Sequence, residues 1–413
     1  MTTQVPGARD LNVYLVACEE SGDRLGAALM RALARRCGGK VRFAGVGGRH
    51  MAALGLASLF PIDDLAIMAF TAVPRRLPMI LRRIRQAAKA AVAARPDVLV
   101  IIDSPDFTHR VARRVRAAAP HIPIIDYVSP TVWAWRPGRA RAMRAFVDHL
   151  LAILPFEPEV HARLGGPACS YVGHPLAEVV GELRPNEAEA RRRAADPPLL
   201  LMLPGSRPNE IKRLIGPFGA AVRLVQERHG ALELVLPTVP ALVARLREAT
   251  ADWPVRPRIT ADDGEKRAAF RRARAALAAS GTVTLELALA AVPTVAAYRV
   301  AAFEAALLRV LVRPPMSVIM ANLVLGARVV PEFLQEHCTA PALADALVPL
   351  LGDTPERRTQ LDAFARLDAI MGLGASPSAK AADAILATIG QARAGRLPNP
   401  ANVLSTAAGG SHA

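Results

Sequence analysis

The chain has 413 residues, too many for one ordinary hydrophobic core, and this length predicts two domains of similar size. Lysine and arginine number 52 against 36 acidic residues, and the net charge of +16 favours an anionic partner such as phosphate, nucleic acid or a membrane surface. Aromatic residues make up only 4%, and the arginines are scattered through Ala/Arg/Leu segments, which disfavours nucleic-acid binding.

The four cysteines include no CxxC pair and none lies beside a histidine, which argues against a zinc site and a disulfide framework. A reducing compartment fits this pattern. The first ten residues lack the basic and apolar regions of a secretory signal. The chain has no run of about 18 apolar residues, so no membrane-spanning helix is predicted.

Short apolar runs alternate with amphipathic segments along the chain, which predicts an α/β fold with parallel sheets covered by helices. We expect two doubly wound, Rossmann-like domains facing a cleft, at 1–180 and 181–370, with the polar stretch 181–198 as the linker region. A C-terminal helix is expected at 371–389 and a disordered tail at 390–413. The predicted strands are 11–17, 41–46, 98–102, 122–127, 149–154, 199–203, 232–236, 275–279 and 293–298.

The segment 67–92 combines bulky apolar side chains with arginines at helical spacing. Two interpretations remain open, a helix that faces the core with a solvated charged side, or a patch on a membrane surface. In the second, guanidinium groups would meet lipid phosphates while apolar groups enter the acyl boundary. The apolar members of this membrane patch are Met68, Phe70, Val73, Leu77, Ile80, Leu81 and Ile84.

Two loops that follow predicted strands of the first half carry carboxylates. The loop 19–23 follows the first strand, and Ser21 or Asp23 is suited to cap the next helix. It lacks the GxGxxG pattern of a nicotinamide-binding turn. Asp103 and Asp106 follow the third strand, where a carboxylate can accept a proton from an attacking hydroxyl, although loop capping is the alternative for either.

The segment 128–136 follows the strand predicted at 122–127 and holds two of the three tryptophans. Ligands bind at strand ends in α/β folds, so this loop is a candidate for recognition, with an aromatic-filled loop as the alternative. Its candidate residues are Ser129, Trp133, Trp135 and Arg136.

Two small-residue turns in the second half suit phosphate binding at the start of a helix. The first is Gly205 and Ser206 with Arg207, whose guanidinium can bind phosphate oxygens. The second is the turn Ser280, Gly281 and Thr282, followed one helical turn later by Glu286, which is suited to accept ribose hydroxyls. This pairing is typical of nucleotide-sugar transferases of the GT-B type.

These segments resemble the motifs of lipid-A-disaccharide synthases in the same order, from about residue 11 to 388. The loop at 17–23 resembles AGEASGD, with Cys18 and Glu20 as departures; 101–107 resembles IDAPDFN; and 128–136 resembles SPSVWAWR. The family has Pro-Asn where this chain has Ala321-Asn322. Further matches are LPFE at 154–157, VGHP with His174, the pair Tyr298-Arg299, MANL at 320–323, and LQE with Gln335.

The resemblance implies an inverting GT-B glycosyltransferase that joins UDP-2,3-diacylglucosamine to 2,3-diacylglucosamine 1-phosphate (lipid X). It implies that Asp103 is the general base, with Glu19 as second candidate. Glu286 would hold the ribose, and Arg207, the Gly205 and Ser280 turns, Asn322 and Gln335 would hold the rest of the UDP. Neither a cofactor nor a metal is expected. The family also implies a cytoplasmic protein at the inner membrane, C-terminal helices packing back on the N-terminal domain, and a possible homodimer that exchanges them.

Other function classes remain open from the sequence. Another GT-B enzyme, such as a peptidoglycan N-acetylglucosaminyltransferase or a UDP-sugar 2-epimerase, would not depend on acyl chains. A nucleic-acid-binding protein would bind duplexes with a steep salt dependence. A non-catalytic scaffold would fail to bind UDP.

Overall fold

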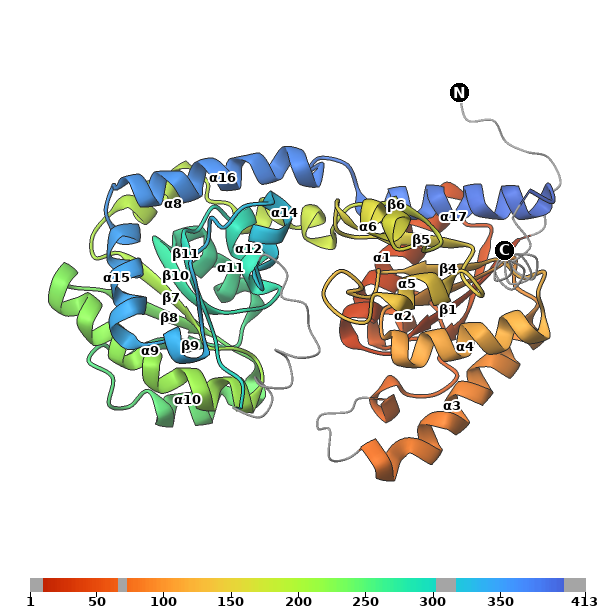
Figure 1. Ribbon diagram of the computed structural model, residues 1–413, viewed down its shortest axis with the longest axis horizontal. Coiled ribbons are helices and arrows are strands. Elements are labelled where there is room, and N and C mark those ends of the chain that lie inside the picture. The colour runs from red at the N-terminus through yellow and green to blue at the C-terminus, as the bar shows by residue number, and fades with distance from the viewer. Residues whose placement is uncertain (1–9, 66–72, 302–316, 397–413) are drawn as a thin grey trace, which may run out of the picture. The chain divides into compact units, whose positions relative to one another are not determined.

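The computed structural model describes residues 10–65, 73–301 and 317–396, which form two compact units. The first contains the described residues up to Pro175 and those from Gly374 onward, and the second contains Leu176–Leu373. The chain therefore passes between the units at 175/176 and 373/374, whereas we expected domain limits at 180/181 and 370/371. Each unit is built on a six-stranded sheet with helices on both faces (Figure 1).

The first sheet has the order β2-β1-β3-β4-β5-β6, and every pair of neighbours is parallel. Alternate side chains of its strands enter two separate cores, one beneath α1 and α17 and the other beneath α3 and α4. Its strands are β1 (Leu11–Ala17), β2 (Val41–Val46), β3 (Val98–Ile102), β4 (Ile124–Tyr127), β5 (His149–Ala152) and β6 (Ala168–Tyr171). Its helices are α1 (Glu20–Arg36), α2 (Arg49–Ala52), η1 (Ile62–Leu65), α3 (Val73–Ala94), α4 (Pro105–Ala118), α5 (Gly138–Met143), α6 (Glu157–Arg163) and α17 (Pro377–Arg393).

The last helix belongs to the first unit although it follows the whole second unit in sequence. Ala381, Ile385 and Ile389 of α17 are buried in the same core as Leu29 and Leu33 of α1. Helix α17 accordingly lies beside α1 (Figure 1). Because these apolar side chains are removed from water, their burial stabilises the attachment of the C-terminal segment to the first unit. The prediction that C-terminal helices pack back on the N-terminal domain is confirmed for α17.

The second sheet has the order β12-β11-β10-β7-β8-β9 and is also parallel throughout. Helices α9 and α15 cover the core on one face, whereas α11 and α12 cover the other. Its strands are β7 (Leu199–Leu203), β8 (Glu233–Pro237), β9 (Arg258–Thr260), β10 (Ala275–Ala279), β11 (Thr294–Tyr298) and β12 (Glu332–Leu334). Its helices are η3 (Pro175–Glu178), which begins at the boundary, α7 (Val180–Leu183), α8 (Glu187–Ala194), α9 (Pro208–His229), η4 (Pro240–Leu242), α10 (Val243–Ala249), α11 (Asp263–Arg272), α12 (Val283–Leu289), α14 (Met320–Leu325), η5 (Gln335–His337), α15 (Ala340–Leu351) and α16 (Pro355–Met371).

All nine predicted strands are present, five with the predicted limits and four with ends that shift by one or two residues. Three strands were missed because β6 is only weakly apolar, and β9 and β12 have three residues each. The expected linker at 181–198 is wrong, since it contains α8, whose Arg193 is buried and donates to carbonyl oxygens of Phe270 and Ala290. The expected tail from residue 390 is also wrong in part, because α17 continues to Arg393.

Strand order reverses once in each sheet. In the first sheet, β2 lies on one side of β1 and β3 lies on the other. In the second sheet, β8 and β9 lie on one side of β7, and β10, β11 and β12 lie on the other. Ligands of open α/β sheets bind beyond the carboxyl ends of the strands at such a switch point. These two places are therefore the first to search for a site.

Candidate functional site

Glu19 and Asp103 lie beyond the two strands that flank the switch point of the first sheet, β1 and β3. Asp103 is half-buried, and its backbone N–H donates to the carbonyl oxygen of Tyr127 at 3.0 Å. Burial raises the pKa of the Cys18 thiol well above its ordinary value, and the nearby charges of Glu19 and Asp103 raise it further. Both expected carboxylates are thus close to the same buried group.

The backbone at Asp103 and Ser104 is left-handed, with φ of 55° and 47°. Such conformations cost non-glycine residues on the order of 1–3 kcal/mol each and persist where surrounding contacts hold them, often at functional sites. Here the Thr108 hydroxyl donates to the carbonyl oxygen of Asp103 at 2.7 Å, and the N–H of Ser104 donates to Oδ1 of Asp103 at 2.7 Å. The elbow at 103–104 therefore fixes the Asp103 carboxylate at the strand end.

Asp106 lies in a different environment on the first turn of α4. Its side chain is 78% exposed and is paired with Arg139 at 2.9 Å and with Arg136 at 3.9 Å. Both guanidinium groups compete for its oxygens, so this carboxylate is less available to an acceptor hydroxyl. Of the two aspartates after β3, Asp103 is therefore better suited to general base chemistry.

A buried pair behind the elbow was not found from the sequence. Nε2 of His109 lies 2.8 Å from Oδ2 of Asp126, and the two residues are 4% and 1% exposed. Burial raises the pKa of Asp126, against the lowering effect of His109. The available signal was the carboxylate within the apolar run 122–127, because aspartate is rarely fully buried unless it is paired.

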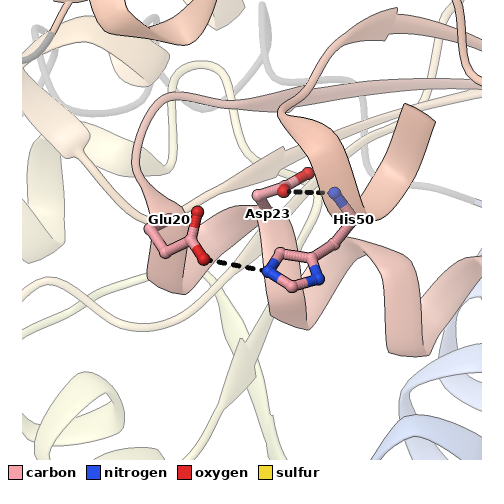
Figure 2. A group of neighbouring side chains, drawn as sticks. All are labelled: Glu20, Asp23 and His50. Carbon is pink, nitrogen blue, oxygen red and sulfur yellow. Dashed lines mark hydrogen bonds and ion pairs between the residues drawn. The ribbon is translucent and has the colours of Figure 1, made fainter. Parts of the chain in front are cut away.

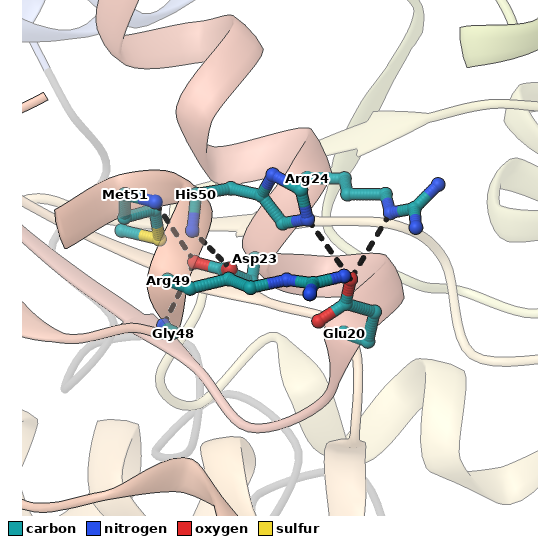
Figure 3. A network of polar contacts seen from close by, with 7 residues as sticks. All are labelled: Glu20, Asp23, Arg24, Gly48, Arg49, His50 and Met51. Carbon is teal, nitrogen blue, oxygen red and sulfur yellow. Dashed lines mark hydrogen bonds and ion pairs between the residues drawn. The ribbon is translucent and has the colours of Figure 1, made fainter. Parts of the chain in front are cut away.

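Glu20, one of the two departures in the first loop, is the centre of a cationic cluster (Figure 3). Its Oε1 accepts from Arg24 at 3.2 Å and Arg49 at 2.9 Å, and lies 2.9 Å from Nε2 of His50. Partial burial raises the pKa of Glu20, but the hydrogen bonds from His50, Arg49 and Arg24 outweigh it and bring the pKa to about 2. The cluster joins the start of α1 to α2.

Asp23 caps α2, and the expectation that it or Ser21 caps α1 is wrong. Its buried carboxylate accepts from the backbone N–H groups of Gly48, His50 and Met51 at 2.7, 2.8 and 3.1 Å (Figure 3). Ser21 is exposed within α1, which begins at Glu20 without a side-chain cap. The carboxylate thus satisfies donors that would otherwise be unpaired at the start of α2.

Ligand atoms of Glu20, Asp23 and His50 lie within 4.8 Å of one another, a spacing compatible with a metal ion (Figure 2). Both oxygens of Asp23 already accept backbone N–H groups, and Glu20 faces two guanidinium groups. A bound cation would have to displace these donors and lie beside two positive charges. The donor set therefore fits a structural ion-pair cluster better than a metal site.

The tryptophan loop is partly an internal anchor. Ser129 is buried, with Oγ 2.8 Å from Nε2 of His161, and Trp133 packs edge-on against Phe156 with ring centroids 5.6 Å apart. Trp135 is half-buried beneath the guanidinium of Arg136, 4.7 Å from its ring centroid, and Arg136 is exposed. Ser129 and Trp133 thus support the loop, whereas Trp135 and Arg136 are accessible to a ligand.

Two buried titratable groups lie beneath this loop. Burial raises the pKa of Glu157 to about 7, although hydrogen bonds, among them one from the N–H of Leu154 at 3.0 Å, oppose the shift. Burial lowers the pKa of His161 to about 4. His174, another expected site residue, is 7% exposed, and burial lowers its pKa to about 4, so it is neutral at physiological pH.

The first turn of the second unit follows β7. Gly205 has φ of 109°, and a Cβ there would lie 2.5 Å from Oε2 of Glu210, so glycine is required. The N–H groups of Ser206 and Arg207 both donate to this Glu210 oxygen at 3.3 Å. The Arg207 side chain pairs with Oε1 of Glu210 at 3.3 Å but is 80% exposed, so its guanidinium is also accessible to a phosphate.

The second turn, Ser280 to Thr282, follows β10, the neighbour of β7 across the switch point. Ser280 Oγ donates to the carbonyl oxygen of Val318 at 2.9 Å, and Gly281 accepts from the Thr284 hydroxyl at 2.8 Å. The Glu286 carboxylate in α12 is paired with Lys266 of α11 at 2.9 Å. Lys266 was missed from the sequence, because its pairing depends on how the two helices pack.

Asn322 is fully buried, and its expected contact with UDP is not supported by its environment. The amide nitrogen donates to Ser317 Oγ at 3.1 Å and to the carbonyl oxygen of Val330 at 2.9 Å, while Oδ1 accepts from the N–H groups of Val329 and Val330 at 3.0 and 2.8 Å. Its hydrogen bonds therefore hold the segment 317–330 together and leave no polar atom for a ligand.

Arg299 and Gln335 lie together beyond β11 and β12. Arg299 Nε donates to the backbone carbonyl of Gln335 at 3.1 Å, and the N–H of Val300 donates to Gln335 Oε1 at 3.3 Å. Gln335 has φ of 50°, another strained position at a strand end. Four neighbouring strands, β12, β11, β10 and β7, thus bring their expected site residues to one edge of the sheet.

The membrane patch is only partly described. Met68 and Phe70, and the side chain of Val73, lie outside the described residues. Leu77 is 41% exposed and Ile80 and Leu81 are half-buried, but Ile84 is fully buried in the core with β1 and β3, so its assignment to the patch is wrong. Across the described residues, no helix is long and apolar enough to span a membrane.

Comparison with solved structures defines the class of this fold. A UDP-GlcNAc 2-epimerase from Neisseria meningitidis bound to UDP-GlcNAc matches with a TM-score of 0.58 and 10% identity, covering 91% of this chain and 99% of that one. MurG from Acinetobacter baumannii matches with a TM-score of 0.52 and 17% identity, covering 88% and 97%. The two doubly wound units form a GT-B fold, and the expected fold class is confirmed.

Sequence comparison then identifies the family. The family model for lipid-A-disaccharide synthetase matches residues 13–386. Lipid-A-disaccharide synthase of Nitrobacter hamburgensis is 60% identical over 382 residues, covering 92% of this chain and 96% of that protein. The enzyme of the same name from Rhodopseudomonas palustris strain BisB18 is 62% identical over 375 residues, covering 91% and 94%. This chain belongs to the lipid-A-disaccharide synthase family and is a glycosyltransferase of lipid A biosynthesis.

Glu157 makes a pH-dependent contribution to stability. Its pKa is raised to about 7 in the folded protein, so the contribution is present below the ordinary value of 4.5 and is lost as pH rises through 7. The loss amounts to about 3 kcal/mol by pH 8. Between pH 5 and 8, the free energy of unfolding of Glu157→Gln measured in urea should therefore rise relative to that of the wild type by about 2–3 kcal/mol.

His161 has the opposite effect, because its lowered pKa removes stability as pH falls from 6.5 towards 4. This effect is common to the wild type and Glu157→Gln, so it cancels in the difference between their free energies of unfolding. Glu159→Gln on the same helix is the matched control, since Glu159 is exposed, and it should follow the wild type at every pH. A difference in free energy of unfolding between Glu157→Gln and the wild type that does not change with pH would contradict the prediction.

Proposed function

We propose that this protein transfers 2,3-diacylglucosamine from its UDP derivative to lipid X, 2,3-diacylglucosamine 1-phosphate. The products are the β-1,6-linked disaccharide 1-phosphate and UDP. The observation that carries the proposal is the 60% identity, over 92% of this chain, to a protein named lipid-A-disaccharide synthase. The strained elbow that fixes Asp103 at the first switch point supports it from the geometry.

The proposed reaction is a single displacement with inversion. Asp103 accepts the proton of the acceptor 6-hydroxyl while that oxygen forms a bond to C1 of the donor sugar. The bond from C1 to the diphosphate oxygen breaks, and UDP leaves with its electrons. Glu19 is the second candidate for the base because it is exposed beyond β1 on the other side of the switch point.

The donor is proposed to bind at the second switch point. Arg207 neutralises charge on the leaving diphosphate, and the turn at 280–282 binds its oxygens, whereas the N–H groups of Ser206 and Arg207 already donate to Glu210. Glu286 accepts ribose hydroxyls, with Lys266 fixing its carboxylate. Arg299 and Gln335 complete this set. Asn322 supports it indirectly: it donates a hydrogen bond to Ser317, and the carbonyl oxygen of the next residue, Val318, accepts one from Ser280. Arginine and backbone N–H groups supply this stabilisation without a metal or another cofactor.

Both proposed substrates carry acyl chains, so we propose a cytoplasmic protein associated with the inner-membrane surface. Leu77 is exposed on α3, and the exposed Arg82 and Arg85 on the same helix can meet lipid phosphates. A homodimer that exchanges C-terminal helices is also proposed from the family resemblance. In this structure, α17 packs on α1 of the same chain.

The activity is tested by incubating the protein with both acylated substrates, detergent and EDTA, with detection of the disaccharide by mass spectrometry. We expect product only when both substrates are present, and no loss on addition of EDTA. Absence of disaccharide with UDP still bound would favour another GT-B enzyme that uses a UDP-amino sugar. Absence of UDP binding would favour a non-catalytic protein.

Asp103→Ala should lower kcat by about a hundredfold or more, the usual contribution of a general base, while UDP binding measured by calorimetry stays unchanged. Asp106→Ala is the matched control, because this carboxylate is exposed and paired with arginines. It should retain most of the activity. Near-normal turnover by Asp103→Ala would transfer the role of base to Glu19.

Leu77→Ser should weaken binding to vesicles of anionic phospholipid about tenfold or more, the effect of withdrawing one leucine side chain from an apolar phase. Leu54→Ser is the control, since Leu54 is 37% exposed in the first unit but lies outside α3. Vesicle sedimentation measures both variants. Equal sedimentation of Leu77→Ser and wild type would exclude Leu77 from a membrane-binding surface.

A further inference from the structure

The buried pair of His109 and Asp126 joins the two elements that support the Asp103 elbow. Asp126 lies in β4 opposite Ile101 of β3, two residues before Asp103, and its side chain meets His109 from the second turn of α4 at 2.8 Å. The His109 ring packs edge-on against Phe146 with centroids 5.2 Å apart. Because both residues are almost fully buried, the pair is a fixed contact between α4 and β4.

The elbow itself is supported from these same two elements. The carbonyl oxygen of Tyr127, next to Asp126 in β4, accepts from the N–H of Asp103. The hydroxyl of Thr108, next to His109 in α4, donates to the carbonyl oxygens of Asp103 and Ser104 at 2.7 and 3.1 Å. The pair therefore sets the spacing between the supports of a backbone that is strained at two consecutive residues.

The pairing also decides what remains behind the elbow when it is broken. Asp126 is almost fully buried, and burial raises its pKa, whereas His109 lowers it. Without His109 the carboxyl loses this partner, and burial favours its protonated, neutral form. Loss of His109 therefore removes the contact between α4 and β4 without adding a charge beside Asp103.

We propose that His109 and Asp126 are positioning residues for the proposed base, which hold the Asp103 elbow between α4 and β4. This inference rests on the proposed function of Asp103. It deepens that function by assigning a role to two side chains that do not touch the substrate.

The test compares kcat, KM and UDP binding for wild type, His109→Leu, Asp126→Asn and the double variant His109→Leu/Asp126→Leu. His109→Leu removes the contact between α4 and β4 that supports the elbow, so the Asp103 carboxylate is misplaced and kcat should fall about tenfold or more. KM and UDP binding should be unchanged, because neither residue belongs to the proposed UDP site. The double variant removes the same contact and should show the same fall in kcat.

Asp126→Asn is the conservative variant, since an amide can accept or donate a hydrogen bond to neutral histidine without a charge. It should keep most of kcat, and it remains informative if His109→Leu does not fold. Wild-type kcat in His109→Leu would overturn the positioning role, and so would a loss of UDP binding as large as the loss of kcat, which indicates a general loss of structure. A loss of kcat in Asp126→Asn as large as that in His109→Leu would also contradict it.

The wild-type measurement separates this inference from the function on which it rests. Disaccharide formation by the wild type together with an unchanged kcat in His109→Leu would overturn the inference and leave the proposed function standing. Absence of disaccharide from the wild type at every pH would overturn both.

Discussion

The parallel direction of every strand pair within each sheet is the constraint on which the rest of the structure depends. It brings the carboxyl ends of all strands to one edge, and the single reversal of strand order leaves a place where consecutive connections diverge to opposite sides. In the first unit this place lies between Glu19 and Asp103. In the second it lies between the turns at 205–207 and 280–282. Chemically useful groups can gather there without interrupting either core.

Buried polar side chains hold the loops at these edges. Three such side chains accept hydrogen bonds from backbone N–H groups of a connecting segment: Asn322, Asp23 and Glu157. These N–H groups therefore have a hydrogen-bond acceptor within the protein in place of water. Removal of such a side chain leaves backbone donors unsatisfied, which costs about 1–3 kcal/mol per group. The same arrangement explains why Asn322 supports a site without entering it: its hydrogen-bonding capacity is already used within the protein.

The large positive charge has several structural uses besides ligand binding. Arg193 and Arg357 are nearly buried and donate to backbone carbonyl oxygens, Arg193 to those of Phe270 and Ala290, and Arg357 to those of Arg274 and Leu350. Burial lowers the pKa of both to about 10, which leaves them charged at neutral pH. Arg207 differs because its side chain is largely exposed. Net charge alone therefore overstates the cationic surface that an anionic ligand could meet.

The sequence by itself determined the α/β class, nine of the strands and the loops that carry Asp103, Arg207 and Glu286, because apolar runs and small-residue turns are local patterns. Motif resemblance indicated the family for the same reason. Tertiary structure decided which polar residues remain available: it buried Asn322 and Ile84, turned Asp23 to α2, and paired Glu286 with Lys266. It also joined His109 to Asp126 across two elements. Burial and pairing depend on residues distant in sequence, so no local pattern contains them.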